Sequence, residues 1–273
     1  MITVKEICLK DLYPCLENGD CNPRLVCYLQ ENLAAMKPFS EARPAMLVIP
    51  GGGYTHFGMK EADPVALEFM NQGFQVFLLF YSLEPYHYPQ QVLEMAAAMN
   101  YIHANAEALS VDKEKVGMIG FSAGGHMVAS YSTHAWRPEI QEKIKAPAAN
   151  AAITGYAVIE NHSCINIFAG KEEMNEEDRL FFSPSANINE MTPPTFLWHT
   201  ATDPVVSVMN SIEYATALIK KGIMTELHIF PKGPHALSTG TRQSVLDPHG
   251  EIAESVKAWV PLVMTWLKQL FKL

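Results

Sequence analysis

The sequence lacks the features that mark membrane proteins, exported proteins and nucleic-acid-binding proteins. None of its apolar runs reaches the roughly 18 residues that a transmembrane helix needs. Its first residues show no basic segment followed by an apolar core, so no signal peptide is visible. The formal net charge of −9 argues against binding to nucleic acid. We therefore expect a soluble protein that has neither nucleic acid nor a membrane as a partner.

Cysteine is scarce, with 5 in 273 residues and no Cys-x-x-Cys pair. The cysteines are Cys8, Cys15, Cys21, Cys27 and Cys164. The first four are spaced almost evenly, as a metal site could be, but their positions on expected strands and the loop between them favour ordinary thiols. A chain of this length buries about three-quarters of its unfolded surface, so it needs neither a disulfide nor a metal to fold. This cysteine usage fits a reducing, cytoplasmic location.

No Ser/Gly/Pro-rich linker, charge block, low-complexity tract or fixed-period repeat divides the sequence, so we expect a single domain over residues 1–273. After residue 45, strand and helix patterns alternate, which predicts an α/β fold with a mostly parallel sheet. Residues 74–80 are a continuous apolar run, typical of a strand buried on both faces. Helical stripes cover residues 92–109 and 252–270, and Pro261 should kink the second helix or mark its start. A further strand is expected at 151–159.

The stretch 160–192 is unusually long for a connection between two expected strands. Its acidic residues crowd together at Glu172, Glu173, Glu176, Glu177 and Asp178. Two interpretations stay open: a small cap over a pocket, or a solvated acidic helix.

The sequence does contain a nucleophile motif, placed between an apolar strand pattern and a helix pattern. Residues 120–124 read Gly-Phe-Ser-Ala-Gly and follow the apolar residues 116–119. This is Gly-x-Ser-x-Gly in the strand–turn–helix setting of a nucleophile elbow. Such a tight turn strains the backbone of Ser122 and admits only tiny neighbours at 120 and 124, where strand and helix touch. We predict that Ser122 is a nucleophile.

Two later residues extend this motif to a triad in the chain order Ser, Asp, His. Asp203 follows an apolar, aromatic strand pattern at 195–200, and His235 follows a β-rich pattern at 225–230. A serine nucleophile needs a general base and a carboxylate that orients the base. Since both residues fall just after expected strands, we predict Ser122, Asp203 and His235 as the catalytic residues.

Three consecutive glycines predict an oxyanion hole. The apolar strand pattern at 45–49 ends in Pro-Gly-Gly-Gly-Tyr at 50–54. Such a run is costly in chain entropy, but it lets backbone N–H groups approach a ligand without side chains in the way. We expect the N–H groups of Gly52, Gly53 and Ala123, the residue after the nucleophile, to stabilise an oxyanion. A flexible turn is the alternative.

Together these segments make the chain resemble an α/β-hydrolase of the esterase and lipase type, and in particular small bacterial esterases known as acetyl-xylan esterases or sugar hydrolases. The likeness runs from the glycine run to Phe-Pro-Lys-Gly-Pro-His at 230–235 and covers nearly the whole domain. Two residues depart from it. Pro50 stands where many relatives have histidine, which alters what braces the glycines, and Pro234 stands where glycine is common. The resemblance implies a mostly parallel, twisted sheet with helices on both faces, opened by antiparallel strands at 2–9 and 24–30.

The expected function is a serine carboxylesterase that hydrolyses short-chain acyl esters, in particular acetyl esters, through an acyl-enzyme and without a cofactor. The resemblance adds carbohydrates as the alcohol part of the substrate. Aromatic residues on loops after expected strands are the candidate substrate contacts: Tyr54, Phe57, Tyr86 and Tyr88. The expected partner is thus a small-molecule ester. The sequence does not fix the oligomeric state, and a homo-oligomer is compatible with it.

Three alternatives stay open. The first is an amide or peptide hydrolase of the same fold, similar to an arylformamidase. The second is a non-catalytic binding protein on a hydrolase scaffold, which the complete triad disfavours. The third is a zinc site of His199, Asp203 and His235, which would leave Ser122 and the glycine run unexplained. His126 is expected to pack against or cap the elbow helix rather than act as the base.

Overall fold

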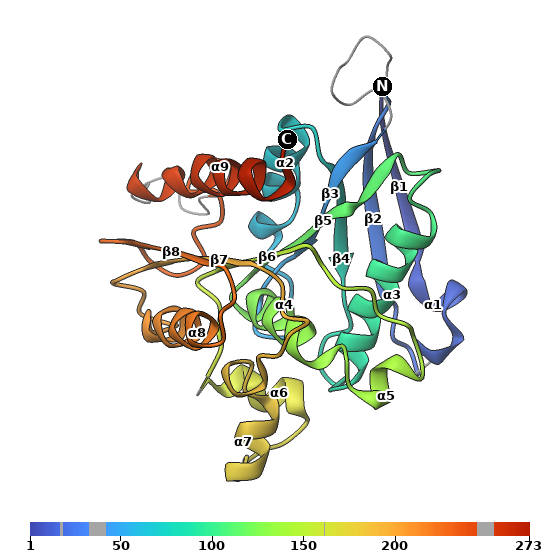
Figure 1. Ribbon diagram of the computed structural model, residues 1–273. Helices are drawn as coiled ribbons and strands as arrows, with labels where there is room; N and C mark the ends of the chain where they lie inside the picture. Colours follow the sequence, from blue (N-terminus) through green and yellow to red (C-terminus); the bar gives the residue numbers. More distant parts are fainter. Residues whose placement is uncertain (17–18, 33–41, 161, 245–253) are drawn as a thin grey trace.

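An eight-stranded sheet forms the centre of the molecule (Figure 1). The structure, a computed structural model, describes residues 1–16, 19–32, 42–160, 162–244 and 254–273. The strands are β1 (Ile2–Cys8), β2 (Arg24–Gln30), β3 (Arg43–Ile49), β4 (Gln75–Phe80), β5 (Val111–Phe121), β6 (Ala151–Gly155), β7 (Thr195–Thr200) and β8 (Thr225–Phe230). Their order in the sheet is β1-β2-β4-β3-β5-β6-β7-β8. The pairs β1–β2 and β2–β4 are antiparallel and every other pair is parallel.

The central strands are buried on both faces, as the sequence predicts for residues 74–80. Every residue of β3 is buried, and so is every residue of β4 except the last. Helices cover both faces of a parallel sheet, and for this reason its strands read as continuous apolar runs rather than as alternating patterns.

Alternate side chains of β3 face two different layers of helices. The longer helices are α2 (Asp63–Asn71), α3 (Gln90–Ala104), α4 (Ala123–His134), α8 (Met209–Lys220) and α9 (Trp259–Phe271). Met46 and Val48 belong to a core shared with α2 and α9, whereas Leu47 and Ile49 belong to a core shared with α3 and α4. α8 packs against β7 and β8 and lies on the same side as α4 in Figure 1. The predicted α/β architecture with helices on both faces is therefore confirmed.

Within residues 162–192 the chain forms several short helices. The short elements of the molecule are α1 (Leu9–Leu12), η1 (Pro14–Leu16), η2 (Met59–Glu61), α5 (Pro138–Gln141), α6 (Ser163–Ala169), α7 (Glu176–Phe182), η3 (Ser185–Asn187) and η4 (Glu254–Ala258). Figure 1 shows α6 and α7 outside α4, at the lower edge of the view. A capping box between Asn175 and Asp178 starts α7, and its exposed first turn carries part of the acidic cluster. Whether the segment acts as a cap stays a prediction.

Three expected elements end earlier or start later than their patterns suggest. The helix expected over 92–109 ends at Ala104, because the side-chain amide of Asn105 donates to the carbonyl oxygen of Tyr101 and caps the helix. The strand expected over 151–159 ends at Gly155, where Tyr156 turns to a positive φ of 37°. α9 starts at Trp259, so Pro261 lies in its first turn, where a missing N–H costs no helical hydrogen bond.

The expected helix stripe at 252–270 begins outside the described residues. Within the described ranges, no helix is both long and apolar enough to cross a membrane. All five cysteines are free thiols.

Candidate active site

Ser122 occupies the sharp turn between β5 and α4. Its backbone has φ 52° and ψ −120°, a conformation that is strained for a residue with a side chain. A Cβ on Gly120 would lie 2.2 Å from the carbonyl oxygen of Gly124, and a Cβ on Gly124 would lie 2.2 Å from that of Ile49. Only glycine fits on either side of the serine, as the sequence predicts for a nucleophile elbow.

The parallel sheet brings the two later candidate residues to the same edge as Ser122. β5, β7 and β8 run in one direction, so the loops that follow them meet at their carboxyl ends. His235 Nε2 lies 2.9 Å from Ser122 Oγ, and His235 Nδ1 lies 2.7 Å from Asp203 Oδ2. The His235 side chain keeps 15% of its surface exposed, so a small molecule can reach the nitrogen–oxygen contact.

Asp203 is held as an ionised carboxylate inside the protein. Its Oδ1 accepts the backbone N–H groups of Val205 at 2.8 Å and of Val206 at 3.0 Å. Burial raises the pKa of Asp203, but hydrogen bonds from His199 and His235 and from the Val206 N–H outweigh it and hold the pKa well below its usual range. An ionised Asp203 accepts the Nδ1–H of His235. The lone pair of Nε2 is then left to accept the Ser122 hydroxyl proton.

The glycine run forms a loop beside Ser122. Gly52 has a φ of 126° and Gly53 a φ of 65°, and a Cβ on Gly52 would lie 2.0 Å from the carbonyl oxygen of His56. The Gly51 N–H donates to Glu61 at 2.7 Å. Among the described residues, no protein acceptor binds the N–H of Gly52, of Gly53 or of Ala123. Those are the three N–H groups that the sequence predicts for the oxyanion.

The four candidate substrate contacts have different environments. Tyr54 has no exposed surface and bonds His126 Nδ1 at 2.7 Å through its hydroxyl, so its side chain packs in the core. A substrate contact at Tyr54 stays a prediction. Phe57 is half-buried beside the glycine loop, against Phe80 and Tyr81. A substrate contact at Phe57 stays a prediction.

The other two candidates lie elsewhere along the sheet edge. Tyr86 and Tyr88 line a cavity of about 470 Å³ with Cys15 and Lys143. The Tyr88 hydroxyl donates to Glu139 at 2.9 Å. Their role as substrate contacts is likewise still a prediction.

His126 and His199 are both fully buried, and neither can serve as the base. Burial lowers the pKa of His126 to about 3, and the ring packs between Tyr54 and Phe168. His199 lies beside Asp203, with Nε2 3.4 Å from Oδ2, and the same nitrogen donates to the carbonyl oxygen of Val206 at 3.0 Å. A zinc site would need ring lone pairs that converge on a metal. Here the nitrogens of His199 and His235 that face Asp203 carry hydrogens.

Two further residues near the triad were not found from the sequence. Glu61 and Tyr156 are buried, and the Tyr156 hydroxyl donates to Glu61 Oε1 at 2.7 Å. The Tyr156 ring lies edge-on to that of His235, with centroids 5.1 Å apart. Burial raises the pKa of both side chains, most strongly that of Tyr156. Neither residue belongs to a motif, and no local pattern in the sequence marks them.

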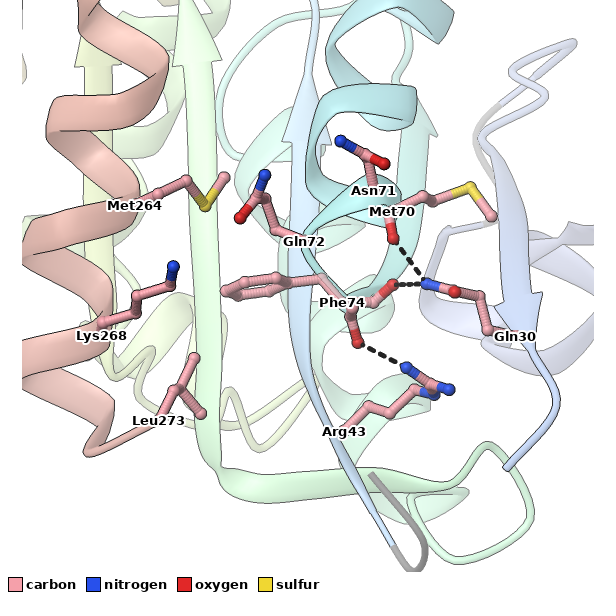
Figure 2. A pocket seen from close by; sticks show the side chains of 10 residues that line it. Gln30, Arg43, Met70, Asn71, Gln72, Phe74, Met264, Lys268 and Leu273 are labelled. Carbon is pink, nitrogen blue, oxygen red and sulfur yellow. Dashed lines mark hydrogen bonds between the residues drawn. The ribbon is translucent and has the colours of Figure 1, made fainter. Parts of the chain in front are cut away.

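A cavity of about 380 Å³ at the opposite edge of the sheet is a different feature (Figure 2). It lies at the amino ends of β3 and β4, next to Arg43 and Phe74, whereas the triad lies at carboxyl ends. Figure 2 shows Gln30 donating to the carbonyl oxygens of Met70 and Phe74, while Arg43 donates to that of Gly73. These polar groups join the β2, β3 and β4 segments.

The chain is similar in sequence to two curated proteins, one named as a xylanase and one as an acetylxylan esterase. It is 32% identical over 231 residues to endo-1,4-beta-xylanase B of Butyrivibrio fibrisolvens, a match that covers 79% of this chain and 35% of that protein. It is 28% identical over 238 residues to an acetylxylan esterase of Xylanibacter ruminicola, covering 82% of this chain and 45% of that protein. The chain thus spans less than half the length of either relative.

A solved structure matches along almost the full length. The acetyl ester-xyloside bifunctional hydrolase of Caldicellulosiruptor lactoaceticus superimposes with a TM-score of 0.82 at 30% identity, covering 97% of this chain and 96% of that one. The family described as BD-FAE matches residues 33–218, which is more than half of the chain. The chain therefore belongs to the BD-FAE family and has the α/β-hydrolase fold.

Proposed function

We propose that the protein is a serine carboxylesterase in which Ser122, His235 and Asp203 form the catalytic triad. The observation that carries this proposal is the unbroken line of contacts from Ser122 Oγ through both ring nitrogens of His235 to Asp203. The names of the relatives, which include an acetylxylan esterase, support a carboxylic ester as substrate.

The reaction follows from the geometry. His235 Nε2 removes the Ser122 hydroxyl proton as Oγ attacks the ester carbonyl, and Asp203 stabilises the resulting imidazolium. The N–H groups of Gly52, Gly53 and Ala123 stabilise the tetrahedral oxyanion, and each such donor is worth roughly 10²- to 10³-fold in rate. The alcohol leaves with the proton from His235. Water activated by the same nitrogen then hydrolyses the acyl-Ser122 ester and regenerates the serine.

The finer proposal is that the acyl group is acetyl and the alcohol a carbohydrate. Two supports are the acetylxylan esterase and the acetyl ester-xyloside hydrolase among the similar proteins. The cytoplasmic location and the small-molecule partner stay predictions from the sequence.

A fluorophosphonate probe tests the mechanism directly. We expect one phosphonyl adduct on Ser122 in the wild type, and neither an adduct nor ester turnover in Ser122→Ala. Ser132→Ala is a matched control, because Ser132 lies on α4 and its hydroxyl donates to the carbonyl oxygen of Val128. It should label and turn over as the wild type does. An adduct on another serine, or turnover that persists in Ser122→Ala, would refute the proposed nucleophile.

The same preparations test the substrate. We expect acetate release from acetylated xylose or xylo-oligosaccharides. We also expect a kcat/KM for acetyl and propionyl aryl esters at least about tenfold above that for octanoyl esters, because the proposed acyl pocket is short and closed and would exclude longer chains. Turnover of aryl esters without any acetylated sugar would leave the esterase mechanism and remove the carbohydrate. Turnover of aryl formamides in preference to esters would favour the amide hydrolase.

A further inference from the structure

A buried carboxylate lies directly behind the loop of residues 50–54, which is called the oxyanion loop below. Glu61, in η2, is 2% exposed, and its Oε2 accepts the Gly51 N–H at 2.7 Å. Gly51 in turn lies against the elbow, since a Cβ on Gly51 would be 3.0 Å from the Cβ of Ser122 and 2.5 Å from the carbonyl oxygen of Phe121. Glu61 therefore holds the peptide that directly precedes Gly52 and Gly53 and that lies against the elbow.

The other carboxylate oxygen of Glu61 is connected, through Tyr156, to the loop that follows β8 and carries His235, called the His235 loop below. Glu61 Oε1 accepts the hydroxyl of Tyr156, and the Tyr156 oxygen accepts the backbone N–H of Ser238 at 3.0 Å. The Ser238 hydroxyl donates back to the carbonyl oxygen of Lys60, the neighbour of Glu61. Ala236 and Ser238 have positive φ values of 60° and 51°, so this loop depends on outside contacts to keep its shape.

The sequence gives a reason for the contact between Glu61 and the Gly51 N–H. Pro50 precedes the glycine run and has no N–H group to donate. Its carbonyl oxygen accepts the Tyr81 hydroxyl at 3.0 Å. A buried carboxylate costs free energy unless its partners compensate for the lost water. Here one donor points at each oxygen: the Gly51 N–H of the glycine loop, and the hydroxyl of Tyr156, which in turn accepts the Ser238 N–H of the loop that carries His235.

We propose that Glu61 and Tyr156 are positioning residues that fix the oxyanion loop and the His235 loop relative to each other. This inference rests on the proposed esterase reaction. Both act through the backbone of neighbouring loops and touch no reacting atom. A carboxylate accepts at both oxygens, whereas a glutamine would turn an NH₂ group toward one of the two donors. Replacing the charge therefore disturbs one loop or the other.

The test compares two variants with two matched controls. Glu61→Gln should lower kcat by about 10²-fold with KM within about threefold, because a misplaced oxyanion donor acts on the transition state more than on the bound ester. Tyr156→Phe should lower kcat about tenfold for the same reason. Glu94→Gln is the control for Glu61→Gln, because Glu94 is also fully buried and also accepts a backbone N–H. Tyr131→Phe is the control for Tyr156→Phe, because the buried Tyr131 donates to the carbonyl oxygen of Pro147.

Both controls should keep kcat within about threefold of the wild type, even where they lower the melting temperature. The second-order rate of phosphonylation of Ser122 is measured in parallel, since it needs the nucleophile and the oxyanion hole but no substrate. It should fall with kcat in Glu61→Gln and Tyr156→Phe. If Glu61→Gln does not fold, Tyr156→Phe decides the question alone, because it removes only the hydroxyl that joins the loops.

Three results would overturn the inference: kcat unchanged in Tyr156→Phe, an equal loss in the controls, or a rise in KM that accounts for the whole loss in kcat/KM. A wild type that turns over esters while Glu61→Gln and Tyr156→Phe do so equally well refutes only the positioning role. A wild type that is neither labelled nor active on esters refutes the proposed function, and the positioning role with it.

Discussion

Asp203 is the residue on which most hydrogen bonds of the triad converge. It is fully buried, and it receives His235 and His199 on one oxygen and two backbone N–H groups on the other. These donors outweigh the effect of burial and hold the pKa of Asp203 well below its usual range, so the carboxylate is charged at neutral pH. Its role in the proposed reaction is to fix the His235 tautomer with the proton on Nδ1.

Asp203→Asn tests that role. The amide keeps the shape of the carboxylate, but its NH₂ group favours the His235 tautomer with the proton on Nε2, which cannot accept the Ser122 proton. We expect a loss in kcat on the order of 10⁴-fold, measured with an acetyl aryl ester. Asp112→Asn, on a carboxylate that pairs with Lys115 at the surface, is the control and should leave kcat unchanged. A loss below about tenfold in Asp203→Asn would mean that another acid orients His235.

At the scale of elements, the contact between strand and helix at the elbow is what fixes Ser122. α4 starts so close to the end of β3 that a Cβ on Gly124 would lie 2.2 Å from the carbonyl oxygen of Ile49 and 2.7 Å from that of Pro50. The Ser122 N–H also donates to Gly155 of β6 at 3.1 Å, so three elements meet at the nucleophile. The strained backbone of Ser122 persists because these neighbours over-determine it.

Gly124→Ala tests how closely the elements approach. The added methyl group would fall 2.2 Å from a backbone oxygen, and neither β3 nor α4 can yield without opening the core. We expect a loss of free energy of unfolding of about 3 kcal/mol or more, measured by urea denaturation. Gly222→Ala is the control for backbone strain alone, because Gly222 has a φ of 77° and no atom within 4 Å of the added Cβ. It should cost about 1 kcal/mol. Gly124 lies in α4 without a positive φ, so a loss in Gly124→Ala no larger than that in Gly222→Ala would show that β3 and α4 yield to the added methyl group.

At the scale of the whole molecule, a feature could be predicted from the sequence where a pattern of neighbouring residues marks it. The elbow, Asp203 and His235 each follow a recognisable strand, and a parallel sheet must bring the ends of those strands to one edge. Glu61 and Tyr156 are 95 positions apart, and their contact exists only after the sheet is folded. Tyr54 lies on a loop after an expected strand, and nothing in the local sequence indicates that its ring turns into the core toward His126. The end of α3 at Ala104 depended on a single side-chain cap.

The pH dependence of stability is also a property of the whole molecule, because several buried groups oppose one another. Burial lowers the pKa of His126 to about 3 and that of His134 to about 4, so the unfolded chain binds more protons than the folded one below the ordinary histidine pKa. These two residues therefore reduce stability as the pH falls. Glu94 acts in the opposite direction. Burial raises its pKa from 4.5 to about 7, although it accepts hydrogen bonds from Ser82 and Gln90.

Glu94→Gln isolates the contribution of that one carboxyl group. Between pH 4.5 and about 7 the folded protein keeps the Glu94 proton that the unfolded chain has already lost, so the free energy of unfolding falls as the pH rises. The slope is at most about 1.4 kcal/mol per pH unit and vanishes above the folded pKa. We expect the difference in stability between Glu94→Gln and the wild type to shift in favour of the variant by about 1–3 kcal/mol from pH 5 to pH 7.5, measured by urea denaturation at each pH. Because the contributions of His126 and His134 are common to both proteins, they cancel in this difference. A difference that stays constant with pH would mean that Glu94 is ionised in the folded protein throughout this range, and that Ser82 and Gln90 compensate fully for its burial.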